Sequence, residues 1–276
     1  MRRVVKVILI VAVVILIAGG VSFAEEGLTA DQILDRMDEA SDRVSAGSLV
    51  SKVRFDNAYS DGTTTSKLFG ILSRPGRSLI CFLEPEAEAG SIFLTVKEEG
   101  VSRMWIYLPL LGIPKELVSE EERSGSFAGS SLSYEDIGSE DRRADYDATL
   151  IGTEELTIGD RVRTAYVIES TAKPDADVEE IRTVMWVDSE YFILLRIEGY
   201  NDLGNLSTTM EVLSLGEFED RLIAEEILSQ DLGAGITTTI TFLGRWRPDE
   251  EIPGEVFLPE NLPDFDPAEW GLIEEG

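Results

Sequence analysis

The chain has 276 residues and a formal net charge of −29. This excess of carboxylates repels nucleic acid and anionic lipid head groups, so nucleic acid is excluded as a partner. The chain contains no His, which excludes Ser-His and Cys-His nucleophiles and histidine-based metal sites. A hydrophobic fraction of 43% is enough for the core of one large β domain or two small ones.

The N-terminus has the pattern of a signal peptide. Arg2, Arg3 and Lys6 precede an apolar run over residues 7–18, and residues 22–24 form a small-x-small cleavage site. We therefore predict a signal peptide over residues 1–24, cleaved after Ala24, and a soluble, periplasmic monomer. The alternative is an uncleaved anchor, although the run is shorter than the ~20 residues that a membrane span needs.

The first element predicted in the mature chain is an amphipathic helix. Thr29 is followed three residues later by Gln32, which is the spacing of a capping box, and Gly47 marks the end of the helix. Between them, apolar residues recur at helical spacing: Ile33, Leu34, Met37, Ala40 and Val44. One face of this helix must therefore be buried against the rest of the protein.

The remainder reads as a long antiparallel meander with turn residues between its strands. We predict strands over residues 48–58, 63–73, 78–83, 91–97, 101–108, 144–151, 161–171, 181–188, 192–200, 206–215 and 236–243. Two stretches are irregular. Residues 109–133 are long enough to form a functional loop or lid, and residues 217–234 hold either a strand or a short helix.

Several predicted strands are apolar on both faces. Residues 79–83 and 192–197 lack the apolar-polar alternation of a sheet with one solvated face, so something must cover the second face. The available covers are the N-terminal helix and the loop at 109–133. We therefore predict a mainly β (α+β) fold in which a strongly curved antiparallel sheet forms an incomplete barrel around the helix and the lid loop.

The sequence gives little sign of catalysis. Cys81 is the only cysteine and lies in an apolar strand, so we interpret it as a buried hydrophobe. Paired carboxylates of a hydrolase arise by chance in so acidic a chain, and the acids at 116–122 lack the ligand pattern of a calcium loop. We expect no enzymatic activity, no cofactor and no metal.

The aromatic residues are more informative. Phe93, Trp105, Tyr107, Phe127 and Trp186 are either ordinary core or the wall of an apolar cavity that takes an acyl chain. Phe127 is the only large apolar residue between Gly125 and Gly129. It is either a plug on a mobile lid edge or a permanent anchor.

A series of short segments resembles, in order and spacing, the outer-membrane lipoprotein-sorting protein family, the LolA/LolB-like superfamily. The resemblance covers about residues 28–245 and implies an incomplete β-barrel around helices, with an apolar cavity for lipoprotein acyl chains. The segments are Phe82-Leu83-Glu84-Pro85, Gly90-Ser91-Ile92-Phe93-Leu94, Trp105-Ile106-Tyr107-Leu108-Pro109, Gly125-Ser126-Phe127-Ala128-Gly129, Ser133-Tyr134-Glu135-Asp136-Ile137, Trp186-Val187-Asp188 and Glu198-Gly199-Tyr200-Asn201, followed by Gly204.

The resemblance implies a LolA-like domain over residues 25–247 that carries lipid or lipoprotein acyl chains between membranes. Its partners would be an inner-membrane transporter or an outer-membrane receptor. The alternative is a periplasmic sensor or accessory subunit that binds an inner-membrane protein, such as an anti-sigma factor or a lipid-exporting pump. Residues 248–276 form an acidic, Pro-rich tail, which we expect to be extended over the domain or to dock a partner.

Overall fold

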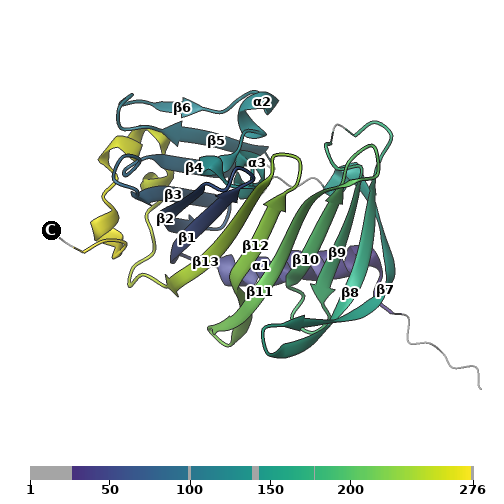
Figure 1. The fold of residues 1–276 in the computed structure, drawn as a ribbon. Helices are drawn as coiled ribbons and strands as arrows, with labels where there is room; N and C mark the ends of the chain where they lie inside the picture. Colours follow the sequence, from purple (N-terminus) through teal and green to yellow (C-terminus); the bar gives the residue numbers. More distant parts are fainter. Residues whose placement is uncertain (1–26, 99–100, 139–142, 177, 275–276) are drawn as a thin grey trace, which may run out of the picture.

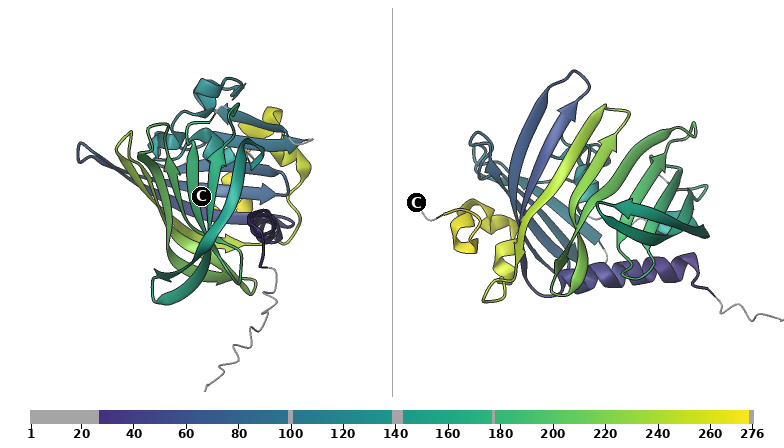
Figure 2. Two further views of the ribbon diagram at one scale, coloured as in Figure 1. Left: turned by 90° about the vertical axis from the view of Figure 1, so that its right-hand side faces the viewer. Right: turned by 60° about the horizontal axis from the view of Figure 1, so that its bottom comes forward.

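The computed structural model describes residues 27–98, 101–138, 143–176 and 178–274, so the predicted signal peptide lies outside the described residues. The fold is one antiparallel sheet of 13 strands in the order β6-β5-β4-β3-β2-β1-β13-β12-β11-β10-β9-β8-β7 (Figure 1). The sheet is strongly curved and its two edges do not pair, which gives an incomplete barrel (Figure 2).

The first half of the sheet is the meander β1–β6, and the second half is the meander β7–β13. The two halves are joined where β1 pairs with β13. The strands are β1 (Leu49–Tyr59), β2 (Thr64–Arg74), β3 (Arg77–Glu84), β4 (Ile92–Glu98), β5 (Val101–Tyr107), β6 (Pro114–Glu116), β7 (Tyr146–Ile158), β8 (Arg161–Ala172), β9 (Arg182–Asp188), β10 (Leu194–Tyr200), β11 (Leu206–Phe218), β12 (Arg221–Asp231) and β13 (Ile236–Trp246).

All eleven predicted strands are present, with shifted ends. The largest difference is in β7, which continues to Ile158 because its polar residues pair with β8 through the backbone. Residues 217–234, for which the sequence allowed either a strand or a short helix, contain strand β12. The predicted loop at 109–133 contains β6, the short helices α2 (Glu120–Arg123) and η1 (Phe127–Gly129), and is followed by α3 (Tyr134–Gly138).

Helix α1 (Ala30–Ser45) confirms the predicted capping box. The Thr29 hydroxyl accepts a hydrogen bond from the backbone N–H of Gln32, and the Gln32 side chain accepts one from the backbone N–H of Thr29. Helix α1 lies along the second half of the sheet (Figure 2), and its apolar stripe is buried there. This cluster consists of Ala30, Ile33, Leu34, Ile168 and Val187, with partly buried side chains from β7 to β10 around it.

The two faces of the sheet are covered by different segments. A row of directly paired residues runs across the sheet from β9 to β1, one residue on each strand. It begins under α1 and ends under residues 125–138, and its members are Met185, Ile197, Met210, Ser229, Thr238 and Asn57. Since directly paired residues point to the same side, α1 and residues 125–138 cover one face, here called the inner face. The opposite side is called the outer face.

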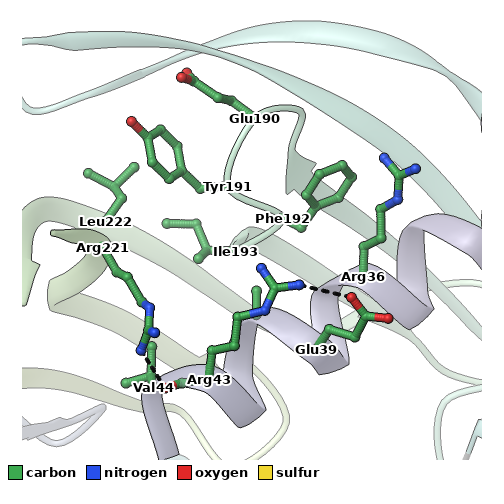
Figure 3. Close-up of a pocket in the computed structure, with 11 residues that line it drawn as sticks. Arg36, Glu39, Arg43, Val44, Glu190, Tyr191, Phe192, Ile193, Arg221 and Leu222 are labelled. Atoms are coloured by element: carbon green, nitrogen blue, oxygen red, sulfur yellow. Dashed lines mark hydrogen bonds and ion pairs between the residues drawn. The ribbon is translucent and has the colours of Figure 1, made fainter. Parts of the chain in front are cut away.

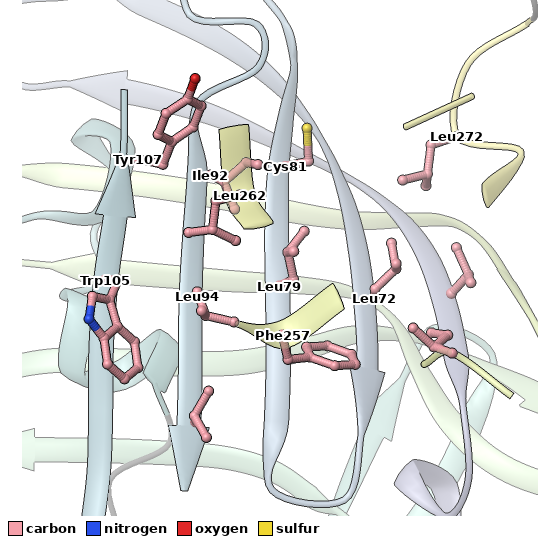
Figure 4. Packing of buried hydrophobic residues seen from close by; sticks show 13 residues of the cluster. Leu72, Leu79, Cys81, Ile92, Leu94, Trp105, Tyr107, Phe257, Leu262 and Leu272 are labelled. Carbon is pink, nitrogen blue, oxygen red and sulfur yellow. The ribbon is translucent and has the colours of Figure 1, made fainter. Parts of the chain in front are cut away.

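The C-terminal segment covers the outer face of β1–β5 (Figure 4). Ile252, Phe257, Leu262 and Leu272 are buried there against side chains such as Leu79. The segment lies over the domain as expected, but it is not extended. It forms three 3-10 turns, namely η3 (Gly254–Phe257), η4 (Pro259–Asp264) and η5 (Pro267–Trp270). The second apolar face of the first strands is thus covered by the tail, and not by the helix or the lid.

Within the described residues, no helix combines the length and the apolar character that crossing a membrane requires.

Candidate ligand-binding site on the inner face

Phe127 is the centre of an aromatic cluster on the inner face. Its side chain is 1% exposed. Its ring centroid lies 5.5–6.2 Å from those of five other rings: Phe55, Phe69, Phe82, Phe93 and Tyr134. Edge and tilted contacts of this kind stabilise beyond the area that they bury. The cluster therefore closes the inner face over β1–β4.

Local backbone geometry aims Phe127 into the sheet. Its N–H donates to the carbonyl of Leu132 at 2.7 Å, and the next two residues, Ala128 and Gly129, have positive φ values of 54° and 75°. Left-handed backbone at two successive residues reverses the chain in a tight turn, and Gly tolerates this better than Ala. The Gly125–Gly129 segment that the sequence singled out is thus a turn that points one aromatic ring inward.

Polar contacts fasten this turn to the sheet. The Tyr59 hydroxyl donates to the carbonyl of Gly129 at 2.9 Å. The backbone N–H of Ser131 donates to the Thr238 hydroxyl at 2.9 Å, and that hydroxyl donates to the Asn57 side chain at 2.8 Å. Since Asn57 and Thr238 are buried, these bonds satisfy polar groups that would otherwise be costly to bury. These hydrogen bonds hold the turn against β1 and β13.

The five aromatic residues named from the sequence do not line one cavity. Phe93 and Phe127 are in contact on the inner face. Trp105 and Tyr107 share a strand face, but it is the outer face, beneath the C-terminal segment (Figure 4). Trp186 also points to the outer side, where its indole N–H donates to Glu154 at 2.7 Å.

A pocket opens at the C-terminal half of α1, where the sequence named no site residue. It has a volume of about 330 Å³ and lies between α1, the turn from β9 to β10 and the start of β12 (Figure 3). Its lining consists of Arg36, Glu39, Ala40, Arg43, Val44, Glu190, Tyr191, Phe192, Ile193, Arg221 and Leu222. The helix side was visible in the sequence as the apolar stripe, but the turn from β9 to β10 and the start of β12 are brought to it only by the fold.

Burial shifts the pKa of several ionisable groups among the described residues. Burial raises the pKa of the Cys81 thiol to about 12, so this thiol stays protonated and unreactive at neutral pH. Burial also raises the pKa of Glu180, whose carboxylate accepts a hydrogen bond from Thr208. Burial lowers the pKa of Arg245 to about 10, and its guanidinium lies 3.7 Å from the Phe242 ring centroid. No group of three or more potential metal ligands occurs among the described residues.

Comparison with known proteins gives the following matches. A family model with the description "Uncharacterized protein" matches residues 75–264, more than half of the chain. Among solved structures, a DUF1329 family protein from Desulfovibrio piger is 21% identical with a TM-score of 0.72, covering 84% of this chain and 98% of that chain. An outer membrane lipoprotein-sorting protein domain from Vibrio parahaemolyticus is 20% identical with a TM-score of 0.70, covering 85% and 99%.

A LolA superfamily protein from Nitrosomonas europaea is 22% identical with a TM-score of 0.63, covering 84% of this chain and 98% of that chain. No curated protein matches the chain. At these identities the likeness shows the fold, and the fold is LolA-like. The fold expected from the sequence is thereby confirmed.

Proposed function

Because the chain belongs to the family whose model matches residues 75–264 and has a LolA-like fold, we propose that it is a periplasmic carrier of lipid or lipoprotein acyl chains. It shields one chain from water during transfer between membranes. Residues 25–247 form the carrier domain, and residues 248–276 act as its outer cover. The function is binding and not catalysis.

The observation that carries this proposal is the apolar character of the inner face. Beside the buried cluster around Phe127, half-buried apolar side chains continue across the sheet from the lid to α1. They include Ile71, Ile106, Ile227, Phe242, Met37, Met185 and Leu194. A surface of this kind, enclosed on one side by a helix and on the other by a loop, suits an alkyl chain. Burial contributes about 0.8 kcal/mol per CH₂ group, so a chain of about a dozen carbons gains enough to leave a bilayer.

In this proposal, Phe127 takes the place of the distal part of the acyl chain in the empty state. Phe93 and Phe127, the two predicted site residues on the inner face, then separate when a chain enters. The closed turn opens by breaking the hydrogen bonds from Tyr59 and Ser131. Trp105, Tyr107 and Trp186 take no part in binding, because they lie on the outer face.

Native mass spectrometry of protein purified from its own envelope tests the carrier function. We expect a mass adduct of a lipid or an acylated peptide. After delipidation, a fluorescent long-chain fatty acid should bind with one-to-one stoichiometry. A protein that carries no adduct and binds no fatty acid after delipidation would rule the carrier function out.

A second candidate function, as an accessory subunit that binds an envelope protein, is favoured by one exposed apolar loop. Between β5 and β6, Leu110 is 99% exposed, Leu111 63% and Ile113 70%. Neighbouring apolar side chains that are left in water in this way are typical of protein contact sites.

The test of the second function is the double variant Leu110→Ser/Leu111→Ser, with Leu203→Ser as the matched control. Leu203 is 78% exposed in the turn from β10 to β11. Loss of an envelope partner in cross-linked pull-downs from the double variant alone, with fatty-acid binding unchanged, would support it. Identical pull-downs from all three proteins would remove this candidate.

A further inference from the structure

The pocket at the end of α1 has an apolar floor. Ala40 and Val44 line the pocket from α1 and continue the helical spacing of its apolar residues. Ile193 and Leu222 lie across the pocket from Val44 (Figure 3). Leu222 is 6% exposed and belongs to the buried cluster of the second half of the sheet, against which Ile193 also packs. A volume of about 330 Å³ is at the lower end of the range for small-molecule sites, so the pocket holds one alkyl chain and not two.

The rim of the pocket carries three guanidinium groups in a chain whose net charge is −29. Arg36 has no acidic partner within ion-pair distance among the described residues, and its guanidinium lies 5.1 Å from the Phe192 ring centroid. The Arg221 guanidinium donates to the backbone carbonyl of Arg43. Both groups keep further N–H donors for a ligand, since a guanidinium has five.

Both carboxylates of the rim, Glu39 and Glu190, have an arginine partner. Glu39 pairs with Arg43 at 2.9 Å, but both side chains are more than 60% exposed, so this pair contributes only about 0–1 kcal/mol and opens readily. Glu190 pairs with Arg163 at 3.0 Å, and Arg163 also holds the buried Asp188. Arg163 leaves one negative charge on Asp188 and Glu190, and the two guanidinium groups of Arg36 and Arg221 outweigh it. The pocket is therefore net positive, whereas the chain as a whole is strongly negative.

We propose that this pocket binds the anionic head group of a single-chain amphiphile, with the alkyl chain on the apolar floor. The proposal rests on the carrier function and names its ligand class. Guanidinium forks match carboxylate and phosphate oxygens, and the apolar floor lies within the same pocket. Carbonyl groups at the C-terminal end of α1 disfavour an anion, and the hydrogen bond from Arg221 offsets this effect.

Titration calorimetry of the delipidated protein with four probes tests the ligand class. The probes are decyl phosphate, decanoate, neutral decyl maltoside and inorganic phosphate. We expect the two anionic decyl probes to bind at least about tenfold more tightly than decyl maltoside, which corresponds to about 1.4 kcal/mol. Inorganic phosphate should bind much more weakly than decyl phosphate, because it has no chain to bury. Equal binding of inorganic and decyl phosphate would overturn the amphiphile in favour of a free anion.

Variants assign the preference to this pocket. Arg36→Gln/Arg221→Gln should remove the preference for anionic decyl probes while leaving decyl maltoside binding within about twofold. Arg54→Gln and Arg161→Gln, at exposed positions on β1 and β8, are the controls and should keep the preference. Ala40→Trp fills the floor and should abolish the binding of every decyl probe.

The outcomes separate this proposal from the carrier function. If decyl probes bind without regard to charge, or if the Ala40→Trp protein still binds them, the chain lies elsewhere and this proposal fails while the carrier function stands. If the delipidated protein binds neither a decyl probe nor a long-chain fatty acid, both fail.

Discussion

Phe127 illustrates how one residue can fix the state of the inner face. Its ring contacts five others, and the turn that carries it is bonded to β1 and β13. A side chain so deeply buried acts as an anchor in the empty protein. The sequence was compatible with Phe127 as either an anchor or a lid residue. The two roles differ in the free energy that is needed to move the ring out of the cluster.

Replacing Phe127 with Ala should lower the free energy of unfolding by about 3–5 kcal/mol, because the ring is lost and a cavity remains. Urea unfolding measures this loss. Leu110→Ala, at a fully exposed position, is the control and should change it by less than about 0.5 kcal/mol. A loss of less than about 1 kcal/mol for Phe127→Ala would show that the ring leaves the cluster at little cost, as a lid residue does.

Glu180 is a second residue whose effect on folding stability can be tested. Burial raises its pKa above the ordinary value of 4.5, and Asp136 and Glu179 add to the effect. As pH rises through 4.5, the unfolded chain therefore releases this proton before the folded protein does. Glu180 thus lowers stability progressively until the folded pKa is passed, after which the penalty is constant.

Glu180→Gln should therefore raise the free energy of unfolding at pH 7, since Gln keeps an acceptor for Thr208 without the charge. The gain should disappear below pH 4.5, where the wild-type side chain is also neutral in both states. Unfolding curves at both pH values measure the difference, with the exposed Glu179→Gln as control. A gain of equal size at both pH values would mean that charge is not its cause.

At the scale of elements, the C-terminal segment depends on one glycine in β2. A Cβ at Gly70 would lie 2.4–2.9 Å from the side chain of Leu272, which is fully buried. Only Gly lets this leucine reach the sheet. The tail is therefore packed as part of the core on the outer face, and not as a loose appendage.

Gly70→Ala should displace Leu272 and lower the free energy of unfolding by about 1–3 kcal/mol. Hydrogen exchange should quicken first in the turns over residues 259–272. Gly244→Ala in β13 is the matched control, since its Cβ would meet Trp246 only at an ordinary 3.7 Å. If Gly70→Ala leaves both stability and exchange of the tail unchanged, the segment is not held by this contact.

Across the whole molecule, the net charge of −29 makes the folded state repel itself. Raising NaCl from about 0.05 M to about 0.5 M should therefore raise the Tm at pH 7, because salt screens the repulsion. The rise should vanish near the sequence pI of about 4.2. A fall in Tm with salt at pH 7 would show that the screening of surface ion pairs outweighs the repulsion.

The sequence by itself determined the local features of this protein. The capping box at Thr29 and Gln32, the strands and the turns between them follow from spacing and residue type within a few neighbours. The sequence also indicated that both faces of the sheet must be covered, because residues 79–83 are apolar on both faces of their strand. The order and spacing of short segments were enough to indicate the LolA-like fold.

Only the tertiary structure decided which face each aromatic residue occupies and what covers it. Phe93 and Trp105 lie on adjacent strands, yet one contacts Phe127 and the other contacts the C-terminal segment. Face depends on register and on bulges, which shift side chains by one residue without leaving a clear trace in the sequence. Arg36 and Arg221 line the same pocket at α1 although they lie far apart in the sequence. No local sequence pattern predicts that two such distant residues come together.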